Sequence, residues 1–158
     1  METSAEYSRC RRYRYALWSK WSAGPSVLFV LLNPSNGDEN SDDPALRRCV
    51  GFARSWGFGS LAVANLFALR TQSPDVLAQA AAPIGRSNDA WLEKLQESAQ
   101  LTIAAWGNHG HLLGRAAEVR PRLANLHILG MTQLGEPQHP LYIAQTENYQ
   151  PWEQLALA

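Results

Sequence analysis

Four short apolar segments without regular polar alternation constrain the fold of this chain more than any other feature. They comprise residues 27–32, 61–64, 101–105 and 126–129. Runs of this kind are typical of strands buried on both faces, as in a parallel sheet that helices cover. Helical spacing between the runs implies right-handed crossovers. We therefore expect an α/β protein, a single three-layer α/β/α domain over residues 1–158 with a central, mainly parallel four-stranded sheet.

Capping residues mark where helices begin between these strands. In Asp43-Pro44 the aspartate is suited to the N-cap and the proline to the first helical position, and apolar residues continue at helical spacing. Ser73-Pro74 marks a second helix start, and Ser87 begins a third. The sequence therefore predicts helices after the first and second apolar segments, with a further helical stretch over residues 110–119.

The N-terminal segment is basic and aromatic. Residues 7–21 form either an opening helix or an edge strand, and the pattern does not choose between them. The whole chain has zero formal net charge, so total charge gives no argument for a nucleic-acid partner. Two interpretations of the arginines stay open: contacts with the phosphates of DNA, or a solvated face beside aromatic residues that pack on the core.

Several function classes lack the residues that they need. No apolar run approaches the ~20 residues of a membrane helix, and residues 1–14 hold no signal-peptide core, so we expect a cytoplasmic protein without membrane contact. The two cysteines are too few to bind zinc or an iron–sulfur cluster, and the acidic segment 38–43 has no matching histidine. We expect no metal, no cofactor and a monomer.

Polar side chains follow the apolar segments at the points where the strands should end: Asn33, Asn65, Asn108 and His139. Ligands of open α/β sheets bind beyond the carboxyl ends of the strands, so these residues point to one shared site. A carboxamide does not titrate near neutral pH, but its oxygen can hold a water and its NH₂ can donate. The alternative is that the asparagines only initiate turns and cap backbone groups.

His139 is the one histidine with a predicted catalytic role. It lies in a loop that Pro137 and Pro140 stiffen, close in sequence to the last apolar segment. A histidine held in a rigid loop near other strand-end polar groups is a candidate for proton or anion chemistry. The other three histidines receive no role.

The chain is identified as a member of the DUF1643 family, a name that implies no particular chemistry. The resemblance spans the whole length of that family and rests on five segments. These are Leu32-Asn33-Pro34-Ser35, Asp42-Asp43-Pro44 with Arg47-Arg48-Cys49, Asn65-Leu66-Phe67-Ala68-Leu69-Arg70, Ala105-Trp106-Gly107 and His139-Pro140-Leu141.

The same segments resemble, more distantly, the uracil-DNA glycosylase superfamily. Asn33-Pro34 is similar to the Asn-Pro-Gly motif of its mismatch-specific and thymine-specific branches, which implies that Asn33 positions the attacking water. Asn65 is similar to the strand-end asparagine that reads the uracil edge. His139-Pro140 is similar to the His-Pro whose histidine stabilises the departing base.

This second resemblance implies further contacts with a flipped base and with DNA. Trp106-Gly107 matches the Trp-Gly that follows the third strand of that superfamily. We expect base contacts from Pro34, Ser35, Asn65 and Phe67, and DNA contacts from Arg47, Arg48, Arg70, Trp106, Gly107 and Asn108.

The resemblance implies a monofunctional DNA glycosylase that hydrolyses the N-glycosidic bond of a flipped-out pyrimidine and leaves an abasic site. Ser35 stands where the uracil-specific branch has a tyrosine that excludes ring substituents, which favours a modified, 5-substituted base and a role in defence against phage with modified DNA. Leu141 follows His139-Pro140 where the superfamily has a serine, so the loop that wedges into DNA is altered. Two alternatives stay open: a nucleobase-binding or nucleic-acid-binding module without catalysis, and hydrolysis of a free nucleoside or nucleotide.

Overall fold

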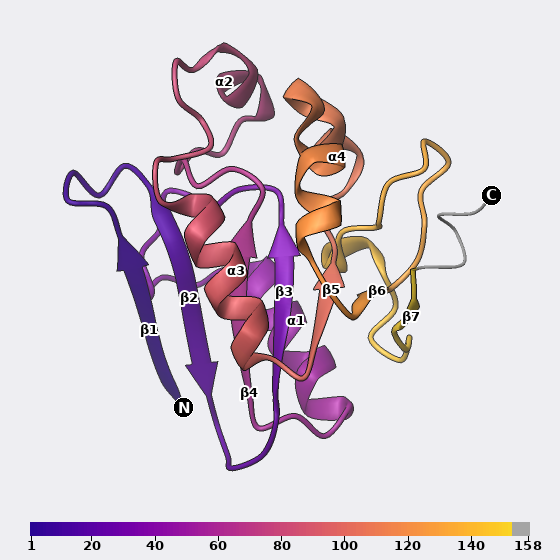
Figure 1. Ribbon diagram of the computed structural model, residues 1–158. Coiled ribbons are helices and arrows are strands. Elements are labelled where there is room, and N and C mark those ends of the chain that lie inside the picture. The colour runs from indigo at the N-terminus through magenta and orange to yellow at the C-terminus, as the bar shows by residue number, and fades with distance from the viewer. Residues whose placement is uncertain (153–158) are drawn as a thin grey trace.

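A computed structural model describes residues 1–152 of the chain, and within them it forms one seven-stranded mixed sheet with helices on both faces (Figure 1). The order of the strands across the sheet is β1-β2-β4-β3-β5-β6-β7. Their bounds are β1 Glu2–Tyr7, β2 Arg14–Lys20, β3 Ser26–Leu31, β4 Ser60–Asn65, β5 Leu101–Ala104, β6 Leu126–Ile128 and β7 Gln150–Pro151.

The four apolar segments form the parallel core of the sheet, as predicted. Strand β3 pairs in parallel with β4 on one side and with β5 on the other, and β5 pairs in parallel with β6. Uninterrupted apolar residues suit these strands because helices cover both of their faces. The carboxyl ends of β3, β4, β5 and β6 therefore lie at one edge of the sheet.

The predicted four-stranded sheet is too small, because antiparallel strands extend it at both edges. Strand β2 pairs with β4, β1 pairs with β2, and β7 pairs with β6. Residues 7–21 thus contribute a strand rather than an opening helix. The hairpin of β1 and β2 covers a backbone edge of β4 that would otherwise be unpaired.

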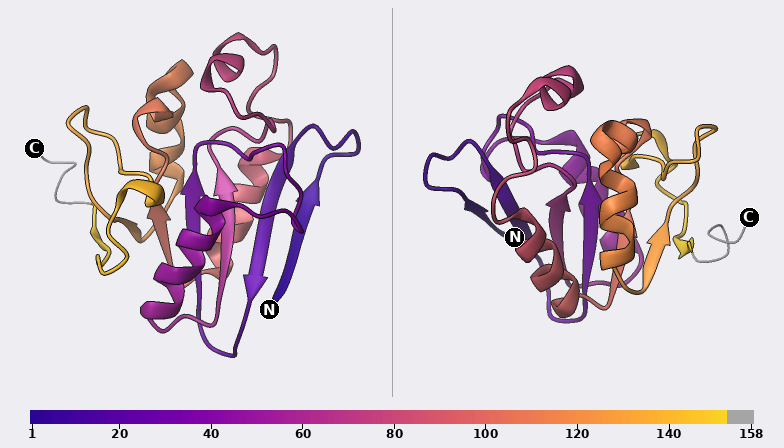
Figure 2. Two further views of the ribbon diagram at one scale, coloured as in Figure 1. Left: turned by 180° about the vertical axis from the view of Figure 1, so that it is seen from behind. Right: turned by 45° about the horizontal axis from the view of Figure 1, so that its top comes forward.

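The helices cover the two faces of the sheet unequally (Figure 2). Helix α1 buries Cys49, Phe52 and Ala53 against one face, whereas α3 and α4 pack on the other. Helix α2 lies near the carboxyl ends of the parallel strands (Figure 1). The helix bounds are α1 Pro44–Ser55, α2 Pro74–Gln79, α3 Asn88–Ser98 and α4 Arg115–Val119.

The predicted helix starts are confirmed. Asp43 caps α1, and its Oδ1 accepts hydrogen bonds from the backbone N–H groups of Ala45 and Leu46 at 2.9 and 3.2 Å. Ser73 and Ser87 occupy the N-cap positions of α2 and α3. The predicted helical stretch over residues 110–119 divides into the 3₁₀ segment Asn108–Gly114 and α4, because Leu112 and Leu113 leave the helical region.

A fully buried arginine fixes the loop that follows β4 to the helices. The guanidinium of Arg115 donates to the carbonyl oxygen of Leu66 at 2.7 Å and pairs with the carboxylates of Asp89 and Glu118. Asn88, at the start of α3, also donates to this loop, through Nδ2 to the carbonyl oxygens of residues 65 and 66. A buried arginine needs such partners because an unpaired charge is costly to bury.

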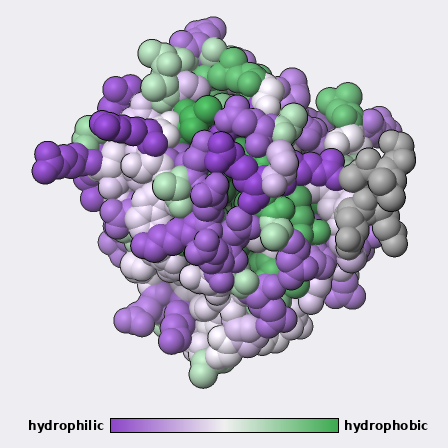
Figure 3. All heavy atoms as spheres, viewed as in Figure 1, coloured by the Kyte–Doolittle hydropathy of each residue, from purple (hydrophilic) through white to green (hydrophobic). Residues whose placement is uncertain are grey.

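No helix within residues 1–152 is both long enough and apolar enough to cross a bilayer. Hydrophilic side chains cover most of the face drawn in Figure 3.

Replacing Asp43 with alanine should lower the free energy of unfolding by about 1 kcal/mol, because two N–H groups of the first turn of α1 lose their acceptor. The matched variant Asp43→Ser keeps an oxygen at the cap and should stay close to the wild-type stability. Urea unfolding followed by circular dichroism measures both. Equal stability of the two variants would contradict the capping role.

Candidate functional site

A cleft of about 680 Å³ lies at the carboxyl edge of the parallel strands. Every one of these strands contributes residues to it through the segment that follows the strand, as expected for an open α/β sheet. The cleft is lined by Leu32, Asn33, Gln72, Pro74, Trp106, Gly107, Asn108, His109, Thr132, Gln138, His139, Leu141 and Tyr142. The structure thus brings Asn33, His139 and the Trp106-Gly107-Asn108 segment to one site.

The orientation of the Asn33 side chain is fixed by backbone carbonyl groups. Its Nδ2 donates to the carbonyl oxygen of Thr71 at 2.7 Å and to that of Pro34 at 3.0 Å. Carbonyl oxygens only accept, so the NH₂ group must face them. The oxygen Oδ1 is therefore the polar atom that Asn33 offers to the cleft, and it can hold a water or a donor of a ligand.

The backbone around Asn33 is held by pairing that continues beyond the end of β3. The N–H groups of Leu66 and Phe67 donate to the carbonyl oxygens of Leu31 and Leu32 at 2.9 and 3.0 Å. Further on, the N–H of Thr71 donates to the carbonyl oxygen of residue 34 at 3.0 Å. The segments after β3 and β4 therefore act as one rigid layer beneath the cleft.

His139 presents a neutral imidazole with a defined tautomer. Its Nδ1 accepts a hydrogen bond from the backbone N–H of Leu141 at 3.2 Å, within the 3₁₀ turn Pro140–Tyr142 that His139 caps. A nitrogen that accepts carries no proton, so the proton of the neutral ring resides on Nε2. Burial lowers the pKa of His139, and the negative charge of Asp43 opposes this effect only in part. His139 is therefore neutral at pH 7, and its Nε2–H is available to donate.

Close backbone packing joins the segment after β5 to the loop that carries His139. Gly107 adopts a φ of 77° in the left-handed region, where glycine is favoured, and its N–H donates to the carbonyl oxygen of Pro137 at 2.9 Å. A Cβ at position 107 would lie 3.6 Å from the Cβ of His139. The buried ring of Trp106 donates through Nε1 to Oε1 of Glu136 at 3.2 Å. These contacts fix the loop that carries His139 against the segment after β5.

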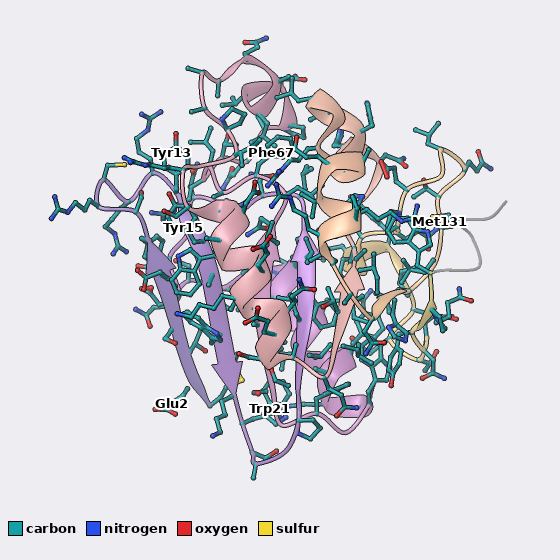
Figure 4. All side chains as sticks on the ribbon, in the orientation of Figure 1. Glu2, Tyr13, Tyr15, Trp21, Phe67 and Met131 are labelled. Carbon is teal, nitrogen blue, oxygen red and sulfur yellow. The ribbon has the colours of Figure 1, made fainter. Side chains whose placement is uncertain are left out.

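Four residues predicted to contact the base do not line this cleft. Asn65 is 1% exposed, and both polar atoms of its amide are buried without a hydrogen-bond partner in the described part of the chain. Phe67 is fully buried in the core that the sheet forms with α3 and α4, and Figure 4 labels its position. Pro34 is buried, and Ser35 is half-buried in the loop before α1.

The three arginines predicted to contact DNA also lie outside the lining of the cleft. Arg47 pairs with Asp42 at 3.0 Å on the exposed start of α1, and Arg48 points toward Gln145 with 3.5 Å between Nη1 and Oε1. Arg70 donates to three backbone carbonyl oxygens, one each from residues 11, 36 and 37. Its guanidinium is therefore largely occupied within the protein.

Several lining residues were not predicted from the sequence. His109 directly follows Asn108, and Tyr142 and Leu141 are 81% and 40% exposed at the rim. The only signal for them was their position next to predicted site residues. Within residues 1–152, no three His, Cys, Asp or Glu side chains come close enough together to hold a metal ion.

The fold and the site define an α/β protein with a polar cleft at the carboxyl edge of a parallel sheet. The chain belongs to the DUF1643 family, because the family model described as "Protein of unknown function (DUF1643)" matches residues 14–141. The match extends from the first residue of β2 to the turn that follows His139. No curated protein and no solved structure matches the chain.

The variant Asn33→Asp should be less stable than the wild type by roughly 1–3 kcal/mol at pH 7, because an oxygen replaces the NH₂ that faces two carbonyl oxygens. Near pH 4 the introduced carboxyl gains a proton that it can donate, so part of the loss should be recovered. The control Asn36→Asp changes an exposed side chain in the same loop. Equal stability of the two variants in urea at pH 7 would contradict the anchoring of Asn33.

The lowered pKa of His139 predicts a pH-dependent contribution to stability. In the unfolded chain the imidazole takes up a proton near pH 6.5, whereas in the folded protein it takes up this proton only at a lower pH. The unfolded state then binds more protons, so stability falls as the pH decreases, by at most about 1.4 kcal/mol per pH unit.

The difference in unfolding free energy between the wild type and His139→Gln isolates this term, because the other histidines are common to both proteins. The difference should be constant above pH 7. As the pH falls from about 6.5 to 5, the wild type should lose stability relative to His139→Gln. Urea unfolding at a series of pH values measures it. A difference that stays constant over the whole range would refute the lowered pKa.

Proposed function

We propose that this protein is a monofunctional DNA glycosylase, which hydrolyses the bond between a flipped-out pyrimidine and deoxyribose and leaves an abasic site. The observation that carries the proposal is the meeting of Asn33 and His139 in one cleft. Its volume of about 680 Å³ falls in the range of sites for small ligands. The resemblance of the strand-end segments to the uracil-DNA glycosylase superfamily supports the choice of substrate.

The roles of the two residues follow from the chemistry of the reaction. When the glycosidic bond breaks, its electron pair leaves with the base, which becomes an anion. The Nε2–H of neutral His139 donates to a base oxygen that gains negative charge, and a fixed donor stabilises the transition state more than the ground state. A water held by Oδ1 of Asn33 adds to the sugar carbon and releases a proton to solvent.

The edge of the base needs donors and acceptors that the cleft can supply. The superfamily resemblance assigns this role to Asn65, which in this structure is buried and does not line the cleft. Contact with Asn65 would therefore require the covering residues to move. Asn108 lines the cleft directly and offers the same carboxamide group. We propose that Asn108 reads the base edge in the conformation described here.

The proposed base is a pyrimidine with a substituent at carbon 5. The resemblance supports this choice, because it implies an excluding tyrosine at the position of Ser35, although Ser35 does not line the cleft in this structure. The volume of the cleft, about 680 Å³, also leaves room for a group larger than a methyl. Excision of such bases would act against phage whose DNA carries modified pyrimidines.

One observation favours a second function, the binding of a base without its removal. The amide of Asn33 cannot take a proton from the attacking water, since a carboxamide does not titrate near neutral pH. A protein that only binds the base would need the same cleft and the same donors. Release of the base separates the two functions.

Single-stranded and duplex oligonucleotides with uracil, mismatched thymine, 5-hydroxymethylcytosine or glucosylated 5-hydroxymethylcytosine provide the test. The wild type should produce alkali-labile breaks at one class of modified base. Asn33→Ala and His139→Ala should each reduce the single-turnover rate by at least about 100-fold while they keep the fold, in line with the loss of one group from a preorganised site.

The control variant is His127→Ala, which changes a histidine of β6 that does not line the cleft. Its rate should match that of the wild type. Binding of modified DNA without any break would favour the binding function, and release of a base from the free nucleotide alone would exclude a DNA substrate. Wild-type rates in both site variants would refute the assigned roles.

A further inference from the structure

A second cavity, of about 470 Å³, lies beside the cleft and is basic in character. Three arginines line it, two from the tip of the β1–β2 hairpin and one from the segment after β4. The lining comprises Arg11, Arg12, Asn36, Leu69, Arg70, Thr71 and Val76. A concave site with several guanidinium groups suits a phosphate or another anion.

The hairpin tip is fixed to the segment after β4 by backbone hydrogen bonds. The N–H of Arg70 donates to the carbonyl oxygen of Arg12 at 2.9 Å, and the N–H of Arg14 donates to that of Ala68 at 2.9 Å. An isolated β-bridge joins residues 13 and 69 between these bonds. The arginines of the tip are therefore presented in a defined place rather than on a free arm.

The guanidinium of Arg70 supplies positive charge and also shapes the cavity. It donates through Nη1 to the carbonyl oxygen of Arg11 at 2.7 Å, and through Nη2 to those of Asn36 and Gly37 at 2.7 and 3.2 Å. These bonds use three of its five N–H donors. Arg70 thus ties the hairpin tip to the loop after Asn33, while its charge adds to the field of the cavity.

The side chains of Arg11 and Arg12 are exposed at this cavity. The guanidinium carbon of Arg11 lies 4.0 Å from the centre of the Tyr7 ring, which limits its motion. Two acidic groups lie nearby. The carboxylate of Asp38 already accepts hydrogen bonds from Asn40 and Ser41, and its pKa is lowered mainly by those bonds. The charge of Glu39 acts on Tyr7 and on Arg14. The three arginines that line the cavity outnumber these two acids, so the cavity keeps a positive potential.

The basic cavity and the cleft are lined by neighbouring residues. Asn33 lines the cleft and Asn36 lines the basic cavity, and Gln72 and Thr71 are divided in the same way. Asn33 and Asn36 are three residues apart, and three residues of extended chain span at most ~10 Å. One strand of DNA places a phosphate about every 3.4 Å along the helix axis, so ~10 Å corresponds to only a few nucleotides.

We propose that the basic cavity binds a backbone phosphate of the DNA strand that carries the flipped nucleotide, within a few nucleotides of that nucleotide. Arg12 and Arg11 are the donors, and Arg70 positions the tip that bears them. The inference rests on the proposed function for its choice of DNA over another phosphate ligand. It assigns the arginine-rich N-terminal segment to substrate binding.

Fluorescence anisotropy with a labelled single-stranded oligonucleotide tests this inference over a series of salt concentrations. The proteins are the wild type, Arg12→Gln, the double variant Arg11→Gln/Arg12→Gln, and the control Lys20→Gln. Lys20 is exposed at the far end of β2 and carries the same charge. Far-ultraviolet circular dichroism and the thermal midpoint verify that each variant folds.

The arginine variants should bind several times more weakly than the wild type at low salt. Each lost phosphate contact should make the slope of log affinity against log salt shallower by about 0.7 for a single strand. Lys20→Gln should match the wild type in both quantities. Affinities and slopes that are the same in all four proteins would overturn the proposal.

Two further arms separate the sources of the phosphate and the two proposals. Competition by deoxycytidine monophosphate or by inorganic phosphate as strong as competition by unlabelled oligonucleotide would overturn the assignment to a DNA strand. Arginine-dependent binding of DNA without base release would leave this inference standing and contradict the glycosylase. Base release with an unchanged kcat/KM in the double variant would support the glycosylase and contradict the phosphate site.

Discussion

The site depends on the pairing of the chain beyond the ends of β3 and β4. Backbone hydrogen bonds from Leu66 and Phe67 continue the parallel ladder, and a further bond joins Thr71 to residue 34. Thr71 also binds Asn33 directly, because its carbonyl oxygen accepts a hydrogen bond from the side-chain amide of Asn33. Without this layer Asn33 would be an ordinary turn residue with a side chain free to rotate. With it, one oxygen is directed to the cleft.

The surrounding structure supports this layer from two sides. On one side the buried guanidinium of Arg115 and the amide of Asn88 bind the carbonyl groups of the loop after β4. On the other side Arg70 binds the loop after Asn33 and the hairpin tip. Functional side chains are positioned more accurately when their supports are rigid, and here each side includes a hydrogen-bonded arginine.

The parts of the fold that follow from local patterns could be predicted from the sequence. Uninterrupted apolar runs indicate buried parallel strands, and Asp43-Pro44 specifies a helix start by local chemistry alone. The expectation that polar residues after parallel strands meet at the carboxyl edge of the sheet also brought Asn33 and His139 together. The β1–β2 hairpin could not be assigned, because its arginines and aromatic residues suit an edge strand and an amphipathic helix equally well.

The position of Asn65 depends on side-chain direction, which sequence alone does not give. Leu61 and Val63 pack against the α1 side of the sheet, and the two-residue period of a strand places Asn65 on the same side. Its amide is therefore covered rather than open to the cleft. Arg70 shows a similar limit, since its carbonyl partners come from three segments that meet only in the folded chain.

A crystal structure of the His139→Ala protein with an oligonucleotide that carries the excised base would test the central claim most directly, since the variant should bind this base but not release it. The account predicts an extrahelical pyrimidine in the cleft, with Oδ1 of Asn33 on one side of the glycosidic bond and the space left by the imidazole beside the base. A nucleotide bound elsewhere on the protein, or a cleft that the base does not enter, would contradict it.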